Sequence, residues 1–120
     1  MRDTFVRTLI TLAKNNPNIE LFTGDLGFGV LKPFWEQLPD QFVNAGIAEQ
    51  NMTAAAAGAA GEGKIVFTYS IGNFPTLRCL EQIRNVGKFP IEYVNTIFPS
   101  PAAPAAAAVM FCSAIPALTN

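Results

Sequence analysis

The chain has 120 residues, half of them hydrophobic, with eight basic and nine acidic side chains and a net charge of −1. A chain of this length has room for one domain with a single core. Its balanced charge offers no electrostatic attraction for nucleic acid or for an anionic membrane, so we expect neither as a partner. Only 14% of the residues are charged, and we expect another protein chain to cover part of the apolar surface.

The cysteines and the N-terminal segment predict a cytoplasmic protein. Cys79 and Cys112 match no metal-ligand or redox spacing, and Cys79 lies in a helical pattern where a buried free thiol is the expected outcome. The lack of a disulfide framework favours a reducing compartment. Charged side chains interrupt residues 1–20, so we expect no signal peptide.

Helical and strand patterns alternate along the first 85 residues. Helices are predicted at residues 3–15, 32–38 (with Pro33 near the start), 49–60 and 76–84, and strands at residues 19–23, 41–45 and 64–70. This alternation predicts an α/β fold, a parallel sheet of at least three strands flanked by helices. The carboxyl ends of such strands meet at one rim, where ligands bind.

Two of these segments have two interpretations each. Residues 53–60 are mostly alanine, so either a second chain or the domain's own sheet can approach this helix closely. Residues 24–29 contain three glycines, which permit a close backbone approach to a ligand. The order of these glycines is not that of a dinucleotide-binding fingerprint, so nucleotide binding is not expected there.

Three side chains at the predicted rim are candidate functional groups. Glu49 follows a strand and a turn, and it lies in the first turn of the alanine-rich helix, where a negative charge gains about 0.3–1 kcal/mol. An acid that only supports the helix start would occupy the same place. Asp25 either lines a ligand or caps its own turn. Phe74 either stacks on a ligand or packs in the core.

Three sequence stretches resemble a known family when they are taken in order. They are Gly24-Asp25-Leu26-Gly27, Gly46-Ile47-Ala48-Glu49-Gln50 and the aromatic segment Phe67 to Pro75. Together they resemble the pyrimidine-binding domain of transketolases, above all the separate C-terminal subunit of split transketolases. The resemblance covers about residues 1–85. It implies thiamine diphosphate as the cofactor, with Mg²⁺ held by a separate diphosphate-binding subunit.

The resemblance also implies roles for five residues, none of them a metal ligand. Glu49 is expected to hydrogen-bond a ring nitrogen of the cofactor's aminopyrimidine and to promote the tautomer that deprotonates the thiazolium carbon. Asp25 and Leu26 are expected to line the cofactor. Phe74, with Tyr69 as second choice, is expected to stack on the aminopyrimidine, a contact that contributes about 0.5–1.5 kcal/mol beyond area burial.

The reaction implied by the resemblance is transfer of a two-carbon ketol unit between sugar phosphates, as in the pentose phosphate pathway. We expect the chain to be inactive by itself and to act in a homo- or hetero-oligomer with the diphosphate-binding subunit. Two alternatives remain open. One is another thiamine diphosphate enzyme, such as a deoxyxylulose phosphate synthase, and the other is an inactive fragment that only associates with a partner.

The sequence changes character after Asn85. The family would continue with a strand and a glycine-rich segment bearing a substrate-handling histidine, whereas this chain contains no histidine. Residues 86–98 have no clear pattern, and residues 99–120 are rich in proline and alanine, which predicts a disordered or loosely packed tail. We therefore expect a fold that is incomplete at its C-terminus, as a truncated or frame-shifted transketolase gene would give.

Overall fold

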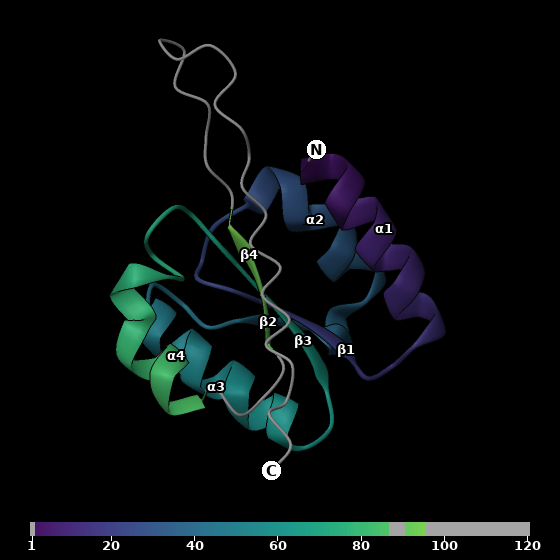
Figure 1. The fold of residues 1–120 in the computed structure, drawn as a ribbon. Coiled ribbons are helices and arrows are strands. Elements are labelled where there is room, and N and C mark those ends of the chain that lie inside the picture. The colour runs from purple at the N-terminus through teal and green to yellow at the C-terminus, as the bar shows by residue number, and fades with distance from the viewer. Residues whose placement is uncertain (1, 87–90, 96–120) are drawn as a thin grey trace, which may run out of the picture.

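The computed structural model describes residues 2–86 and 91–95, and it confirms the predicted α/β fold with a parallel sheet. Within these residues the sheet has four parallel strands in the order β2-β1-β3-β4. The elements are α1 (Arg2–Asn15), β1 (Ile19–Thr23), α2 (Phe28–Gln37), η1 (Pro39–Gln41), β2 (Phe42–Asn44), α3 (Glu49–Gly61), β3 (Ile65–Ser70), η2 (Leu77–Cys79), α4 (Leu80–Val86) and β4 (Ile91–Asn95). Helices α1 and α2 lie on one side of the sheet, and α3 and α4 lie on the other (Figure 1).

The strand order creates a switch point between β1 and β3. From β1 the chain crosses through α2 to β2 at one edge, then returns through α3 to β3 on the other side of β1. Connections that leave two neighbouring strands toward opposite faces open a crevice at the strands' carboxyl ends, where ligands bind in open α/β sheets. The rim formed by the ends of β1 and β3 is therefore the place to look for a functional site.

The side of the sheet facing α1 and α2 holds a core of large side chains. Alternate residues of β1 and β3 point to this side, and Leu21 of β1 lies beside both Phe42 of β2 and Phe67 of β3. The buried residues of this cluster are Val6, Leu9, Ile10, Ala13, Ile19, Leu21, Leu31, Phe34 and Tyr69. Helix α1 packs well because its apolar residues recur at helical spacing and leave the charged ones outside.

The side facing α3 is packed with smaller residues. Its buried cluster contains Phe22, Met52, Ala56, Ala57, Ala60 and Val66. Because the alanines have almost no side chain, α3 can approach β1 and β3 closely. Of the two interpretations of the alanine-rich helix, packing against the domain's own sheet is confirmed.

Three element predictions differ from the structure. Helix α2 begins at Phe28 rather than at residue 32, so Pro33 lies inside it. The start is fixed by Gly27, whose φ of 79° turns the chain and whose carbonyl accepts hydrogen bonds from the backbone N–H groups of Val30 and Leu31. Pro33 lacks an N–H donor for the carbonyl four residues earlier, and that residue is Gly29, where no side chain crowds the turn.

The predicted helix at residues 76–84 is split in the structure. It starts as the single turn η2, and regular α-helix runs only from Leu80 to Val86. Farther along, residues 86–98 contain the strand β4, which pairs with β3 along its length. The prediction for residues 99–120, like Cys112, lies outside the described residues.

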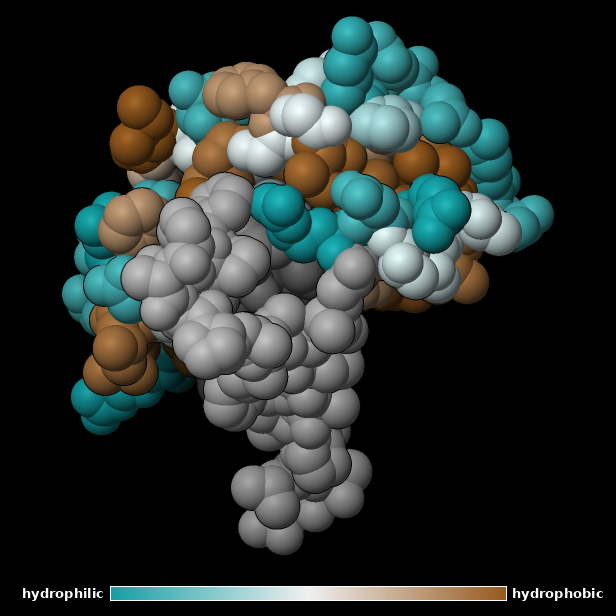
Figure 2. Space-filling view, turned by 90° about the horizontal axis from the view of Figure 1, so that it is seen from above, coloured by the Kyte–Doolittle hydropathy of each residue, from teal (hydrophilic) through white to brown (hydrophobic). Residues whose placement is uncertain are grey.

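Large apolar side chains remain exposed around the domain. They are Leu12, Phe28, Val43, Ile47, Ile65, Leu77 and Leu80. Figure 2 shows such apolar surface lying open between polar groups on one face of the molecule. None of the helices in the described part of the chain has the length and apolar content that crossing a bilayer requires.

Candidate functional site

Glu49 lies at the switch point and is held there by the ends of β1 and β3. It is the first residue of α3, and only 4% of it is exposed. The hydroxyl of Ser70, the last residue of β3, donates a hydrogen bond of 3.1 Å to Glu49 Oε1. A carboxylate is rarely so deeply buried without a task or a partner. Its position at the helix N-terminus adds favourable interaction with the helix dipole.

Gly24, the residue after β1, forms the wall behind this carboxylate. A Cβ atom built on Gly24 would lie 3.2 Å from Glu49 Oε1 and 3.3 Å from the carboxyl carbon. That spacing is tighter than ordinary van der Waals contact, so a side chain here would press the carboxyl group out of place. Gly24 therefore permits a close approach to its backbone, and the group that lies against it is the Glu49 side chain.

Arg78 joins Glu49 to Phe74 across the rim. Its Nη1 atom lies 3.6 Å from Glu49 Oε2, and its guanidinium carbon lies 4.1 Å from the centre of the Phe74 ring. One planar cation therefore contacts both the buried carboxylate and the aromatic face. Phe74 is half-buried, so part of its side chain is accessible from outside the domain.

Hydrogen bonds from two side chains hold the backbone carbonyls of Phe74 and Arg78 in place. The thiol of Cys79 donates a hydrogen bond of 3.1 Å to the carbonyl of Phe74. Burial raises the pKa of the Cys79 thiol, which keeps it protonated as a donor at neutral pH. The predicted buried free thiol is thus confirmed. On the other side, Gln50 Nε2 donates to the carbonyl of Arg78 at 3.0 Å, which ties η2 to the start of α3.

Asp25 takes part in a separate hydrogen-bonded pair at the same rim. Asn44 Nδ2 donates to Asp25 Oδ1 at 2.8 Å, and Asn44 Oδ1 accepts from the backbone N–H groups of Asp25 and Gly46, each at 3.0 Å. Asn44 therefore fastens the loop after β1 to the loop after β2. Asp25 has a positive φ of 57°, which this pairing holds in place. In this structure its carboxylate supports the turn.

Leu26 and Tyr69 lie toward the other side of the sheet. Tyr69 is 2% exposed and belongs to the core beneath α1 and α2, because successive residues of β3 alternate between faces and Ser70 takes the face of Glu49. Leu26 packs against that same core. The structure thus brings together Glu49 and Phe74, sets Asp25 nearby on Asn44, and turns Tyr69 away from Glu49.

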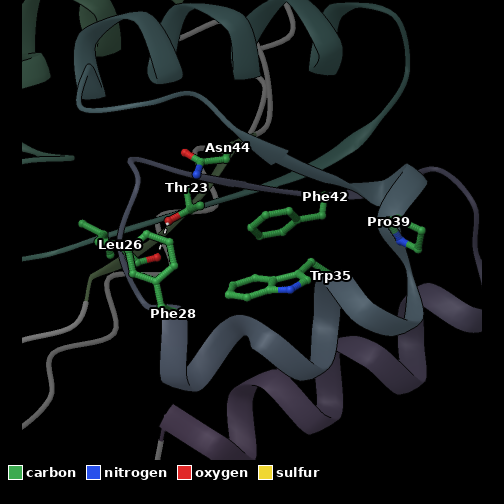
Figure 3. Close-up of a pocket in the computed structure, with 7 residues that line it drawn as sticks. All are labelled: Thr23, Leu26, Phe28, Trp35, Pro39, Phe42 and Asn44. Atoms are coloured by element: carbon green, nitrogen blue, oxygen red, sulfur yellow. Dashed lines mark hydrogen bonds between the residues drawn. The ribbon is translucent and has the colours of Figure 1, made fainter.

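A cavity of about 330 Å³ lies between α2 and the edge strand β2. Its lining residues are Thr23, Leu26, Phe28, Trp35, Pro39, Phe42 and Asn44. In Figure 3 the rings of Trp35 and Phe42 face each other, 5.4 Å apart between centroids, and Pro39 lies at the opposite end from Phe28. Neither Glu49 nor Ser70, Phe74 or Arg78 lines this largely apolar cavity.

No individual role is predicted from the sequence for Ser70, Arg78 or Asn44. Ser70 was predicted only as part of a strand, and Arg78 only as part of an amphipathic helix. Position is a signal for two of them, because Asn44 and Ser70 are the last residues of strands whose ends a parallel sheet brings to one rim, whereas Arg78 lies in η2, beyond the loop after β3. Within residues 2–86 and 91–95, no three acidic, cysteine or histidine side chains gather as they would around a metal ion.

A parallel α/β domain with a buried carboxylate at its switch point defines a ligand-binding domain of the doubly wound class. The model of one family, the transketolase pyrimidine-binding domain, matches residues 1–118. The chain belongs to this family. The match runs beyond residue 85, where the resemblance expected from the sequence ends.

Individual relatives agree with this assignment. The chain is 43% identical over 91 residues to a putative transketolase C-terminal section of Methanocaldococcus jannaschii, covering 75% of this chain and 29% of that protein. It is 37% identical over 84 residues to a subunit of the 6-deoxy-6-sulfo-D-fructose transketolase of a Clostridium species, covering 69% and 26%. A 1-deoxy-D-xylulose-5-phosphate synthase of Clostridium perfringens is 33% identical over 103 residues, covering 71% and 17%.

A solved structure with the same fold is a split-gene transketolase described as an inactive β4 tetramer. It superposes with a TM-score of 0.69 at 33% sequence identity, covering 77% of this chain and 32% of that one. The chain thus spans less than a third of the length of each of these relatives.

Proposed function

We propose that this chain supplies the pyrimidine-binding half of a thiamine diphosphate site in a transketolase-type enzyme. The observation that carries the proposal is the pairing of buried Glu49 with the ring of Phe74 around one planar, N–H-bearing group, the guanidinium of Arg78. An aminopyrimidine is also planar and also bears N–H groups. The residues present therefore fit the cofactor's ring, with the carboxylate at its edge and the aromatic ring on its face.

The cofactor, when bound, supplies a carbon acid in its thiazolium ring that becomes a nucleophile. The task of Glu49 is to hold a proton at a nitrogen of the pyrimidine ring. Ser70 donates to Oε1 and so orients the carboxyl group, which leaves Oε2 to face the ligand. Burial strengthens this hydrogen bond because little water competes for it. Gly24 and Ser70 fix where the proton is held, and Phe74 fixes the plane of the ring.

We further propose that a diphosphate-binding subunit completes the site and holds the Mg²⁺. Two observations support this step: the relatives include a C-terminal section of a putative transketolase and a transketolase subunit, and the described residues offer no cluster of metal ligands. The proposed reaction is transfer of a two-carbon ketol unit between sugar phosphates. The alternative is the deoxyxylulose phosphate synthase reaction, supported by 33% identity over 103 residues to such an enzyme.

The decisive test is Glu49→Gln in the assembled enzyme. We expect hydrogen–deuterium exchange at the thiazolium carbon, followed by NMR, to slow by about 10²–10⁴-fold, the range for loss of a positioned proton-transfer group. Glu62→Gln is the matched control, because Glu62 is an exposed acid at the other end of α3. Exchange at the wild-type rate in a folded, cofactor-loaded Glu49→Gln complex would remove Glu49 from the mechanism.

A second test addresses the division of the site between two chains. Titration calorimetry of the 120-residue chain with thiamine diphosphate and Mg²⁺ should show binding no tighter than millimolar, about −4 kcal/mol, because only the pyrimidine would be grasped. The same titration after addition of the diphosphate-binding subunit should show far tighter binding. Micromolar affinity of the purified chain for thiamine diphosphate would contradict the division of the site between two chains.

A further inference from the structure

We propose that Arg78 occupies the position that the pyrimidine ring would take and must move out before the cofactor can bind. This inference rests on the proposed function, since it takes Glu49 and Phe74 as the cofactor's contacts. The guanidinium satisfies both groups at once, at 3.6 Å from Glu49 Oε2 and 4.1 Å from the centre of the Phe74 ring. A ring stacked on that face of Phe74 and bonded to Oε2 would need the same space.

The side chain of Arg78 can move while its backbone stays in place. Its N–H donates to the carbonyl of Asn73 at 3.0 Å, and its own carbonyl accepts from Gln50 at 3.0 Å. Its side chain, in contrast, is 48% exposed. Rotation about side-chain bonds therefore carries the guanidinium into solvent without disturbing the turn between β3 and α4.

The contacts of Arg78 are suited to being given up. A tight charge-assisted hydrogen bond between a guanidinium and a carboxylate spans about 2.7–2.9 Å, so a separation of 3.6 Å is a loose ion pair. Half-exposed ion pairs and cation–π contacts are each weak in water. Nevertheless, Glu49 is almost fully buried, and a buried carboxylate without a counter-charge or donors is strongly disfavoured. Arg78 thus covers the carboxylate until the ligand's own N–H groups arrive.

The direct test is an NMR titration of the full 15N-labelled chain with 4-amino-5-hydroxymethyl-2-methylpyrimidine, the pyrimidine half of the cofactor. In the free chain the Nε–H proton of Arg78 should be shifted upfield by the Phe74 ring. Adding the pyrimidine should move this signal toward that of a solvated arginine, in step with shifts of the Glu49 and Ser70 backbone amides. Phe74→Leu should abolish the upfield shift and so confirm its origin.

Variants of Arg78 give the quantitative readout. Arg78→Gln should bind the pyrimidine about three- to tenfold more tightly, because one weak ion pair and one weak cation–π contact no longer compete. Arg78→Lys keeps the charge but loses the planar stack on Phe74, so its affinity for the pyrimidine should fall between those of the wild type and Arg78→Gln. Arg84→Gln removes an equal charge from the exposed side of α4 and should leave the affinity unchanged.

The outcomes separate this inference from the proposed function. Tighter binding by Arg78→Gln, with release of the Arg78 signal in the wild type, supports both. Equal or weaker binding by Arg78→Gln, with Glu49 still perturbed by the ligand, overturns the role of Arg78 and keeps the pyrimidine site. Ligand shifts that avoid Glu49 in both chains overturn both ideas. No binding by either chain up to tens of millimolar overturns the role of Arg78 and leaves the proposed two-subunit site in place.

Discussion

The two faces of the sheet are built in different ways. Beneath α1 and α2 the core consists of leucines, isoleucines and aromatic rings, with Leu21, Leu31 and Phe34 fully buried. Beneath α3 it consists mainly of alanines, and nearer the rim come the buried hydroxyls of Thr53, Thr68 and Ser70 and then Glu49. The first face buries far more apolar area per residue, which is the main source of stability.

The difference shows how one small sheet can serve two purposes. A large apolar core tolerates no buried charge, so the carboxylate lies where the packing residues are small and polar partners are near. The alanines let α3 approach closely, and this approach brings Glu49 within hydrogen-bond distance of Ser70. Stability should therefore respond mainly to changes on the α1/α2 face, and cofactor chemistry mainly to changes on the α3 face.

The largest expected effect is loss of stability in Phe34→Ala. Phe34 is completely buried, and removing its ring leaves a cavity, which costs about 3–5 kcal/mol. Phe28→Ala is the matched control, because Phe28 lies on the same helix and is 58% exposed. Urea unfolding followed by circular dichroism should show a change below about 1 kcal/mol for the control. Equal losses in both variants would contradict the assignment of the α1/α2 core.

The elements on both faces could be predicted from the sequence because their patterns are local. The apolar spacing of α1 and the β-branched, aromatic run of β3 each indicate one element without knowledge of the rest. The start of α2 could not be predicted in this way. The sequence predicts a glycine-containing loop at Gly27 and a helix start near Pro33, and only the three-dimensional turn at Gly27 makes that glycine the helix start.

The site could be predicted only in part. Glu49 and Phe74 were found through the resemblance to the transketolase family, and the structure brings both to one guanidinium. The hydrogen bond from Ser70 spans 21 residues of sequence, and the contact of Gln50 with Arg78 spans 28. Pairings at such separations depend on strand order, which no local pattern contains. For the same reason, no local pattern indicates that Tyr69 lies on the α1/α2 side of β3, away from Glu49.

The next largest effect should come from Gly27→Ala, which disturbs the α1/α2 face. The new Cβ would lie 2.9 Å from Tyr69 Cε1 and 3.0 Å from Leu31 Cδ1, and the φ of 79° disfavours any residue with a Cβ. Backbone strain of about 1–2 kcal/mol and overpacking of about 1–3 kcal/mol should together lower the free energy of unfolding. Thermal and urea unfolding measure it, and a loss below about 1 kcal/mol would show that the turn relaxes freely.

A smaller effect is expected when the alanine face is overfilled. Ala57→Leu places a larger side chain between α3 and the sheet, where Ala57 is 2% exposed, and overpacking costs about 1–3 kcal/mol. Ala55→Leu adds the same atoms on the exposed side of α3 and should change stability by less than about 0.5 kcal/mol. If both variants unfolded at the wild-type midpoint, the close approach of α3 to the sheet would not matter.

The smallest effect on stability, and the sharpest test of the comparison, is expected for Gly24→Ala. Its Cβ would lie 3.2 Å from Glu49 Oε1, so the carboxyl group must give way by a few tenths of an ångström. We expect a stability loss below about 1 kcal/mol, because the atoms that yield are the end of one side chain. In the assembled enzyme, however, exchange at the thiazolium carbon should slow by about tenfold or more, since catalytic geometry tolerates little displacement.

Gly27→Ala should show the reverse, a large loss of stability with near-normal exchange at temperatures where it remains folded. If Gly24→Ala lost stability as Gly27→Ala does while keeping wild-type exchange, the division of labour between the two faces would be wrong.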